Sequence, residues 1–363
     1  MGIRNSTLEN MVDLVFFSHF KGKKVLVTGH TGFKGSWLTF LLHYIGAEVT
    51  GFALAPNTSP NLFDLLEVES KCHSNIADVN DAKAVLNAVE ACQPDFILHL
   101  AAQPLVRHSY KQPLDTFATN VMGTANLLDA CKSLNKKCTV VCITTDKVYH
   151  NFEWEFPYRE NDRLGGYDPY SASKAAAEII IDSYRNSFFK YSKISIASVR
   201  AGNVIGGGDW SEDRLFPDLI NSISNSKPIE LRNPSAVRPW QHVLDPISGY
   251  LKLAYQMDTN PGSFNEAWNF GPYNHDSLTV LEVCQKAIAV FKKGSIAIDQ
   301  NKHPHEAGQL RLDISKAVFH LDWQPTWSTE VAIQKTSNWY KLFLEGENVT
   351  SLVQQDINEF FKL

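Results

Sequence analysis

The sequence predicts an α/β protein with a doubly wound parallel sheet and a smaller, loop-rich C-terminal domain. Short, almost continuously apolar segments in the first half indicate buried strands, and stretches with helical spacing lie between them. Strands that alternate with helices form a parallel sheet covered on both faces, which requires strands that are apolar throughout. The predicted strands are residues 24–28, 48–53, 95–100, 139–144 and 194–199, and the clearest helices are 37–44, 81–91 and 119–131.

Composition excludes several classes of protein. The 363 residues are 44% hydrophobic and 20% charged, with a formal net charge of −5. This apolar fraction excludes intrinsic disorder, and the slightly acidic balance argues against nucleic-acid binding. A run of about 18 uncharged apolar residues, which a membrane span needs, is missing. The six cysteines include no Cys-x-x-Cys pair, so we expect reduced thiols and a cytoplasmic location.

A glycine-rich turn follows the first predicted strand and opens a helix. Residues 28–35 read Thr-Gly-His-Thr-Gly-Phe-Lys-Gly. Such glycines let backbone amides approach a pyrophosphate at the helix N-terminus. The place of this turn after the first strand favours a Rossmann-type dinucleotide site over an ordinary strand-to-helix turn. The predicted cofactor contacts in the turn are Gly29, Thr31, Gly32, Phe33, Lys34 and Gly35.

The loop after the second strand favours NAD over NADP. An acidic residue usually holds the adenosine ribose about twenty residues beyond the glycines, and residues 52–57 contain none. The same loop has no Arg or Lys that could hold a 2′-phosphate. Lys34 is the nearest cation, and its alternative interpretation is a solvated lysine in the first turn of a helix.

Tyr170 and Lys174 lie four residues apart at the start of a predicted helix that continues to Tyr184. Residues at this spacing share a helix face, so the ammonium can lower the pKa of the phenol from about 10. A tyrosinate formed in this way can take a proton from a sugar hydroxyl while a hydride leaves for the nicotinamide. A chance surface pair is the alternative interpretation, which the glycine turn makes the weaker one.

Three regions are expected along the chain. Residues 1–20 are interpreted as an N-terminal packing arm and not as a signal, because they contain no basic cluster or cleavage site. Residues 21–200 form the predicted NAD-binding domain, which also takes in roughly 236–268. Residues 201–363, which begin with a segment rich in glycine and tryptophan, form the predicted sugar-nucleotide-binding domain.

With these motifs the chain resembles the extended short-chain dehydrogenase/reductase family. The matching motifs, in chain order, are the glycine turn, Asp78-Val79, residues 99–103, residues 120–123, Tyr170/Lys174, residues 200–203, residues 313–317 and residues 321–325. The resemblance implies that Asp78 and Val79 meet the adenine and that Lys174 holds the nicotinamide ribose. It further implies cofactor contacts from Leu100, Ala101, Ala102, Gln103, Asn120, Tyr170 and Arg200.

Residues 144–149, Thr-Thr-Asp-Lys-Val-Tyr, distinguish this chain within the family. They end the strand before the Tyr170 helix, at the sheet edge where ligands bind. Reductases and epimerases of the family need only a Ser or Thr here, whereas sugar-nucleotide 4,6-dehydratases add an acid and a base, usually as Thr-Asp-Glu. Here Lys147 stands in the third position. A salt-bridged strand end is the alternative interpretation, and it is the weaker one because adjacent strand residues point to opposite faces.

Together with the glycine turn and residues 238–242, Arg-Pro-Trp-Gln-His, the Thr-Asp-Lys motif resembles dehydratases whose hexose carries cytidine diphosphate. The implied reaction begins when Tyr170 deprotonates the 4-hydroxyl, with Thr145 bonded to the 4-oxygen, and hydride passes from C4 to NAD. A base then removes the C5 proton, Asp146 protonates the departing 6-hydroxyl, and the hydride returns to C6. Lys147 is the candidate base, provided that it is neutral; a charged Lys147 that only stabilises the intermediate is the alternative.

The diphosphate of the substrate needs cations, and Arg suits bidentate contacts with phosphate. The predicted substrate contacts are Gln103, Thr145, Asn203, Arg214, Arg238 and His305. Residues 303–306, His-Pro-His-Glu, also suggest a metal site, but further ligands at zinc-like spacing are missing, so no metal is expected.

Two competing functions remain open in the sequence. A nucleotide-sugar 4-epimerase shares Tyr170 and Lys174 but does not need the Asp146-Lys147 pair, and a non-catalytic NAD-binding protein needs neither pair. The helices at 120–131 and 170–184 match those that join subunits in the family, so the resemblance implies a homodimer. It also implies a role in deoxysugar biosynthesis for surface polysaccharide, such as the O-antigen of lipopolysaccharide.

Overall fold

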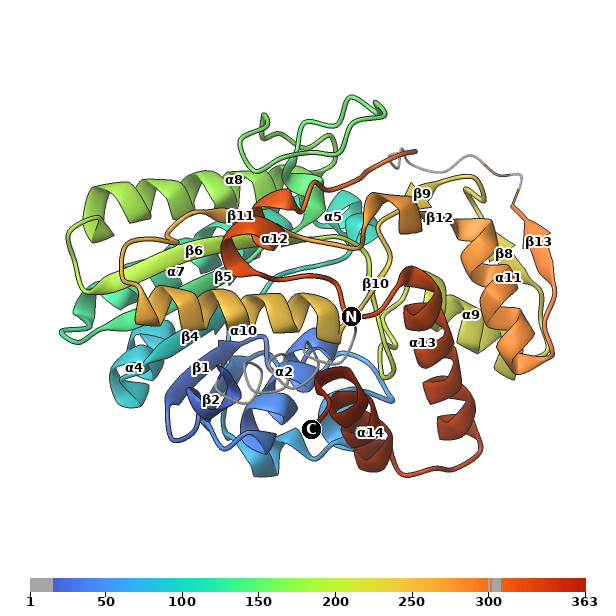
Figure 1. The fold of residues 1–363 in the computed structure, drawn as a ribbon, viewed down its shortest axis with the longest axis horizontal. Helices are drawn as coiled ribbons and strands as arrows, with labels where there is room; N and C mark the ends of the chain where they lie inside the picture. Colours follow the sequence, from blue (N-terminus) through green and yellow to red (C-terminus); the bar gives the residue numbers. More distant parts are fainter. Residues whose placement is uncertain (1–15, 300, 302–307) are drawn as a thin grey trace, which may run out of the picture.

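A seven-stranded parallel sheet forms the centre of the computed structural model, which describes residues 16–299, 301 and 308–363. The strand order is β11-β6-β5-β4-β1-β2-β3, and all neighbours are parallel (Figure 1). The strands are β1 (Lys24–Thr28), β2 (Glu48–Ala53), β3 (His73–Ile76), β4 (Phe96–His99), β5 (Cys138–Ile143), β6 (Ile194–Ala201) and β11 (Ala267–Phe270). The predicted fold class is therefore confirmed.

Helices cover both faces of this sheet, because successive strand residues point to opposite sides. Val25 and Val27 pack in one core with α2 and α10, whereas Leu26 between them packs in a second core with α4, α7 and α8. These helices are α2 (Phe33–Tyr44), α4 (Ala82–Cys92), α7 (Gly123–Ala130), α8 (Pro169–Tyr184) and α10 (Leu244–Thr259). The single helix predicted for 119–131 is divided: a π-helical turn, Ala118–Met122, precedes α7.

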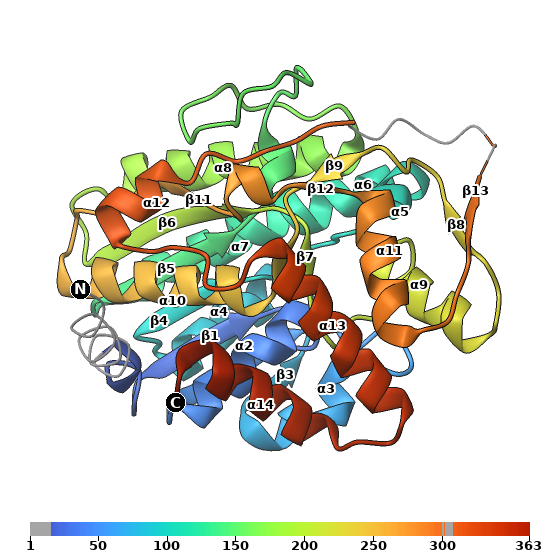
Figure 2. The same cartoon turned by 45° about the vertical axis from the view of Figure 1, so that its right-hand side comes forward.

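Three two-stranded sheets follow the end of β6. They pair β7 (Val204–Ile205) with β10 (Gln241–His242), β9 (Val237–Arg238) with β12 (Leu278–Thr279), and β8 (Ile229–Leu231) with β13 (Ile296–Ile298). Figure 2 shows β8 and β13 grouped with α9 (Leu215–Ser224) and α11 (Val280–Phe291) to one side of the large sheet. Further α-helices in the described part of the chain are α3 (Leu62–Leu65), α5 (Val106–Lys111), α6 (Pro113–Phe117), α12 (Ser315–Leu321), α13 (Thr329–Leu344) and α14 (Val349–Phe361).

The chain passes back to the large sheet after residue 240, where α10 packs on β5 and β11 pairs with β6. Phe270 of β11 packs edge-on against Tyr250 of α10, with ring centroids 5.8 Å apart. The loops that leave the carboxyl ends of β5 and β6 therefore lie between the sheet and the later strands. This is the edge at which parallel α/β sheets bind their ligands.

Residues 16–20 of the predicted N-terminal arm pack against the body of the protein. Phe17 contacts Phe361 edge-on at 4.7 Å, and Phe20 lies 4.9 Å from Phe96, both measured between ring centroids. Residues 1–15 lie outside the described part of the chain. All six cysteines are free thiols, and within the described residues no helix is both long and apolar enough to cross a bilayer.

Candidate active site

The glycine turn after β1 has the geometry of a phosphate cradle. Gly29 adopts a φ of +77°, and a Cβ on it would lie 2.8 Å from the Ala101 amide nitrogen. Helix α2 begins directly after Gly32, whose lack of a side chain leaves the amides of the first turn uncapped by their own N-cap residue. Uncapped amides at a helix N-terminus are suited to a pyrophosphate. The residues present therefore fit a dinucleotide cofactor.

Lys34 in this turn is half-buried and points inwards. Its ammonium lies 3.3 Å from the Tyr250 hydroxyl of α10. Burial, followed by the charges of Arg214 and Lys174, lowers the pKa of Lys34 to about 7. The interpretation as a solvated lysine is therefore wrong, because the side chain contacts Tyr250 and lies close enough to Arg214 and Lys174 for their charges to lower its pKa.

The other predicted cofactor residues follow the carboxyl ends of β3 and β4. The Ala101 amide donates to Thr28 Oγ1 (3.2 Å), and Gln103 donates its amide to Asn120 Oδ1 (2.8 Å). Asn120 in turn donates to Ser173 Oγ at 2.8 Å, which ties this loop to α8. Leu100 and Ala102 lie in the same loop, while Asp78 and Val79 lie beyond the end of β3.

Helix α8 places Tyr170 and Lys174 at the end of β5. Asp168 caps the helix by accepting the Ser171 amide at 2.9 Å, and Pro169 takes the first helical position. Tyr170 and Lys174 are both buried, and the Lys174 ammonium donates to the Ile143 carbonyl at 3.3 Å. The structure thus brings both residues to the predicted edge of the sheet.

The Thr-Asp-Lys motif forms a 3-10 turn, Asp146–Val148, and not a strand end. Thr145 caps this turn, and its hydroxyl donates to Asp146 Oδ1 at 2.9 Å. Asp146 is 2% exposed, whereas Lys147 is half-buried. Asp146 and Lys147 are therefore not adjacent strand residues with side chains on opposite faces, because the strand has already ended at Ile143.

Burial dominates the protonation of these groups. It raises the pKa of Tyr170 to about 12, against the hydrogen bond from Thr145 and the charge of Arg214, which lower it. The expectation that Lys174 lowers the pKa of the phenol is therefore wrong, because desolvation outweighs the charges around Tyr170. Burial also raises the pKa of Asp146, although Lys147 and Thr145 act in the opposite direction. Asp146 is thereby shifted towards the protonated form that a general acid needs.

Asp146 packs against the segment that follows β6. A Cβ on Gly202 would lie 3.1 Å from Asp146 Oδ2 and 2.3 Å from Pro239 Cγ, so only glycine fits there. Among the described residues, no group donates a hydrogen bond to Asp146 Oδ2, although that oxygen is buried. The neighbouring Arg238 is buried, and its charge acts to lower the pKa of Asp146.

The predicted substrate residues are only partly brought together. Arg238 donates to the carbonyls of Val237 (3.0 Å) and Gly308 (3.2 Å), and Arg214 pairs with Asp209 at 3.3 Å. Asn203 follows β6, and the Gln103 side chain bonds within its own loop, to Leu105 and Thr116. His305 lies outside the described residues.

Arg200 does not reach towards the cofactor turn. Its guanidinium is buried and pairs with Glu178 of α8 at 2.8 Å, and it donates to the Tyr149 hydroxyl and the Glu160 carbonyl, each at 2.9 Å. Sequence reasoning assigned no role to Glu178. Its spacing, four residues after Lys174 on the same helix, is the signal that could have identified it.

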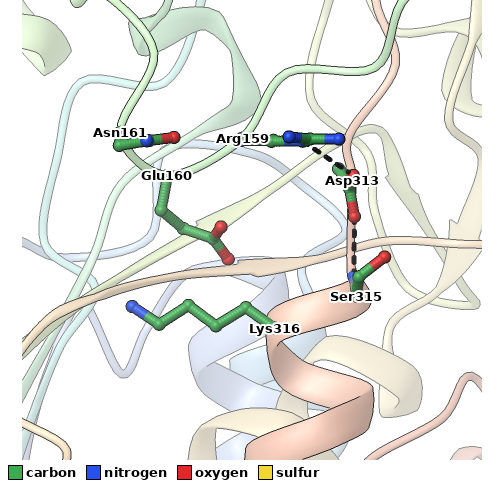
Figure 3. Close-up of a pocket in the computed structure, with 6 residues that line it drawn as sticks. All are labelled: Arg159, Glu160, Asn161, Asp313, Ser315 and Lys316. Atoms are coloured by element: carbon green, nitrogen blue, oxygen red, sulfur yellow. Dashed lines mark hydrogen bonds and ion pairs between the residues drawn. The ribbon is translucent and has the colours of Figure 1, made fainter.

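A separate hollow of about 300 Å³ lies between the loop after β5 and α12 (Figure 3). Arg159 Nε pairs with Asp313 Oδ2 at 3.3 Å, and Asp313 Oδ1 accepts the Ser315 amide at 2.8 Å. Glu160, Asn161 and Lys316 complete the lining. These contacts join the loop to α12 and include none of the predicted catalytic residues, so the hollow is not assigned to the active site.

Comparisons with known proteins identify the family of this chain. The family model described as GDP-mannose 4,6 dehydratase matches residues 26–336. A CDP-glucose 4,6-dehydratase of Salmonella typhimurium is 44% identical over 356 residues, covering 96% of this chain and 98% of its own.

Solved structures share the fold. An epimerase of Methanothermobacter thermautotrophicus superposes with a TM-score of 0.79 at 21% identity, covering 95% of this chain and 98% of its own. A UDP-glucuronic acid 4-epimerase of Bacillus cereus, solved with UDP-glucuronic acid and NAD, has a TM-score of 0.75 at 25% identity and covers 88% of this chain and 99% of its own. The chain belongs to the GDP-mannose 4,6-dehydratase family, within the extended short-chain dehydrogenases/reductases.

Proposed function

We propose that this protein catalyses the NAD-dependent 4,6-dehydration of CDP-D-glucose to CDP-4-dehydro-6-deoxy-D-glucose and water. The observation that carries the proposal is the buried Asp146, held by Thr145 beside Tyr170 and shifted towards its protonated form. Elimination of water needs such an acid, whereas epimerisation does not. The Salmonella relative named for this activity, at 44% identity over nearly the whole chain, supports the choice of substrate.

The cofactor would be held by the glycine turn and by residues at the ends of β3, β4 and β5. Gly29, Gly32 and the first turn of α2 would hold the pyrophosphate, with Thr31, Phe33, Lys34 and Gly35 beside it. NAD supplies the acceptor and donor of hydride in this chemistry. Asp78, Val79 and the loop 100–103 would flank the adenosine half, and Lys174 would hold the nicotinamide ribose.

Tyr170 acts first in the proposed mechanism. Its phenolate takes the proton of the 4-hydroxyl as C4 is oxidised, and Thr145 donates a hydrogen bond to the 4-oxygen. Because burial raises the pKa of Tyr170 to about 12, the phenolate depends on nearby groups that favour it, which are the charge of Arg214 and the hydrogen bond with Thr145. The resulting 4-ketone makes the C5 proton acidic.

Asp146 and Lys147 carry the elimination. Lys147 removes the C5 proton while Asp146 gives its own proton to the 6-oxygen, so the C6–O bond breaks and water leaves. Reduction at C6 and return of a proton to C5 give the 4-keto-6-deoxy sugar, with no net oxidation. The charge of Lys147 lowers the pKa of Asp146 and so opposes the acid form. The pair therefore works only if the lysine is neutral when the sugar is bound.

Arginines would hold the diphosphate of the substrate. Arg238 lies beside Asp146, and Arg214 acts electrostatically on both Lys34 and Tyr170, so the two cations flank the catalytic groups. Guanidinium groups at this position can bind phosphate oxygens in a bidentate manner and orient the sugar towards Tyr170. Asn203 and Gln103 would add neutral contacts, and His305 remains a candidate.

The protein is proposed to act as a homodimer in the cytoplasm. Apolar side chains are exposed on the segments that the resemblance assigns to subunit pairing: Met122 is 54% exposed and Ile179 on α8 is 59% exposed. Burial of such residues in a partner stabilises a dimer. Six free thiols fit a reducing compartment. The product would feed deoxysugar synthesis for surface polysaccharide, such as an O-antigen.

Incubation with NAD and each of CDP-glucose, dTDP-glucose, UDP-glucose and GDP-mannose tests this function. The expected result is loss of water and a 4-keto product from CDP-glucose, with much slower turnover of the others. Formation of the C4 epimer without loss of water would instead identify an epimerase. No reaction with any of them, despite NAD binding, would indicate a non-catalytic protein.

A further inference from the structure

Glu178 lies on the face of α8 that carries Tyr170 and Lys174, two turns beyond the tyrosine. It is 3% exposed and sits between the helix and the sheet. Each of its carboxylate oxygens is bonded: Thr144 Oγ1 donates at 2.5 Å to one, and Ser198 Oγ (2.7 Å) and Arg200 (2.8 Å) donate to the other. A carboxylate is this deeply buried only when it is paired and hydrogen-bonded.

Thr144 provides two links, one to the catalytic groups and one to β6. Thr144 immediately precedes Thr145, whose side chain bonds to Asp146 and acts on Tyr170. The hydroxyl of Thr144 also donates to the Val199 carbonyl at 3.1 Å, so Glu178 holds the point where the chain leaves β5 against β6. Displacing this carboxylate would therefore move the turn that carries the proposed acid and base.

The third link is electrostatic. Burial lowers the pKa of Lys174 to about 8, and the Glu178 carboxylate is the largest influence that opposes this. The other titratable groups that act on Lys174 are Cys142 of β5, His99 of β4 and Lys34 of α2. Burial alone would raise the pKa of Glu178, but the charge of Arg200 and the hydrogen bonds hold this pKa below its ordinary value. Glu178 is thus a fixed negative charge one turn below the lysine.

We propose that Glu178 is a positioning residue for the reaction: it supplies the buried counter-charge of Lys174 and holds the Thr144–Asp146 turn in place. Its catalytic consequence rests on the proposed dehydratase function. The effect of Glu178 on the pKa of Lys174 does not depend on that function, because the fold alone buries the two side chains one helical turn apart. Arg200 belongs to the same unit, since it pairs with Glu178 at 2.8 Å, keeps that carboxylate ionised and donates to the Tyr149 hydroxyl.

Two substitutions separate the charge of Glu178 from its shape. Glu178→Gln keeps the shape and removes the charge, so Lys174 should lose its proton at lower pH and the alkaline limit of kcat should move down by about one pH unit. Glu178→Asp keeps the charge and shortens the reach to Thr144, so kcat should fall while the alkaline limit stays in place. An alkaline limit that is unmoved in a folded Glu178→Gln variant would overturn the proposal.

Thermal unfolding gives a readout that needs no turnover. The pKa of Lys174 in the folded protein, about 8, lies below the ordinary lysine value of 10.5, so the cost of burying the ammonium is present at neutral pH and disappears as pH rises through that interval. Removing the counter-charge enlarges this cost. The Tm difference between wild type and Glu178→Gln should therefore shrink by roughly half between pH 7 and pH 10.

In a Lys174→Met background the same Tm difference should no longer depend on pH. A difference that stays constant with pH in the wild-type background would show a merely structural role. If Glu178→Gln does not fold, Glu178→Asp still decides: a kcat equal to that of wild type in this variant would overturn the proposal. Failure of wild type to dehydrate any sugar nucleotide would overturn the proposed function but leave these unfolding results interpretable.

Discussion

The catalytic groups around α8 and Arg214 of the proposed diphosphate region differ in how deeply their charges are buried. Around α8 the ionisable groups are buried, and desolvation is the largest influence on the pKa values of Asp146, Tyr170 and Lys174. In the later segment Arg214 is partly exposed and paired with Asp209. Burial thus brings the two protonation states of Asp146 and Lys174 closer in energy at neutral pH but moves those of Tyr170 further apart, whereas the guanidinium of Arg214 stays charged. The two regions should therefore respond differently to substitution.

The largest effect is expected at Tyr170. Tyr170→Phe removes the base for the 4-hydroxyl and should lower kcat by roughly a thousandfold or more. Tyr167→Phe is the matched control, because this tyrosine is 82% exposed three residues earlier. Steady-state formation of the 4-keto sugar measures both variants. A Tyr170→Phe enzyme with a tenth of wild-type activity would remove the tyrosine from the mechanism.

Lys147 should give the next largest effect. Lys147→Met should still produce NADH on mixing with CDP-glucose, because oxidation at C4 precedes loss of the C5 proton, but product formation should slow by about a hundredfold. Rapid mixing with NADH absorbance, followed by product analysis, separates the two steps. Lys132→Met is the control, since that lysine forms a surface pair with Asp129. Dehydration by Lys147→Met near the wild-type rate would show that Lys147 is not the base.

A binding effect is expected at Arg238. Arg238→Lys keeps the positive charge beside Asp146 but loses the planar fork, so KM for CDP-glucose should rise about tenfold with little change in kcat. Initial rates over a range of substrate concentrations give both constants. A fall in kcat at constant KM would place Arg238 with the catalytic groups and would remove the contrast between the two regions.

The smallest effect is a gain of stability. Asp146→Asn should stabilise the fold by about 1 kcal/mol at neutral pH, because it replaces a buried carboxyl whose Oδ2 accepts no hydrogen bond among the described residues. The folded pKa of Asp146 lies above its unfolded value, so the wild-type penalty is present at neutral pH and is lost as pH falls towards about 4. Urea unfolding at neutral pH and at about pH 4 should show that the difference in stability between wild type and Asp146→Asn becomes smaller at the lower pH. Destabilisation at neutral pH would contradict the account.

The parts of the molecule that depend on short-range patterns could be predicted from the sequence. The bounds of β1 and β2, the glycine turn and the start of the Tyr170 helix follow from local residue spacing. The inward path of Lys34, the burial of Arg200 against Glu178 and the packing of Gly202 against Asp146 could not be predicted. Each of these features depends on a contact with a residue that is distant in the sequence, and a local residue pattern does not show which distant residue will be in contact.

The short helical turn at residues 146–148 shows the same limit. The sequence gives residues 146–148 the appearance of a continuing strand, but the Thr145 hydroxyl caps a 3-10 turn there and buries Asp146. A side chain that bonds its neighbouring backbone competes with strand hydrogen bonding, and the outcome depends on what surrounds it.

The fate of the hydrogen on C4 tests the central claim most directly. CDP-glucose deuterated at C4 would be converted with unlabelled NAD, and the product analysed by NMR and mass spectrometry. The account predicts a 4-keto-6-deoxy sugar with the deuterium at C6, because the hydrogen removed at C4 is returned to the carbon that loses water. Deuterium that remains at C4, in a sugar with inverted configuration and all its oxygen, would contradict it.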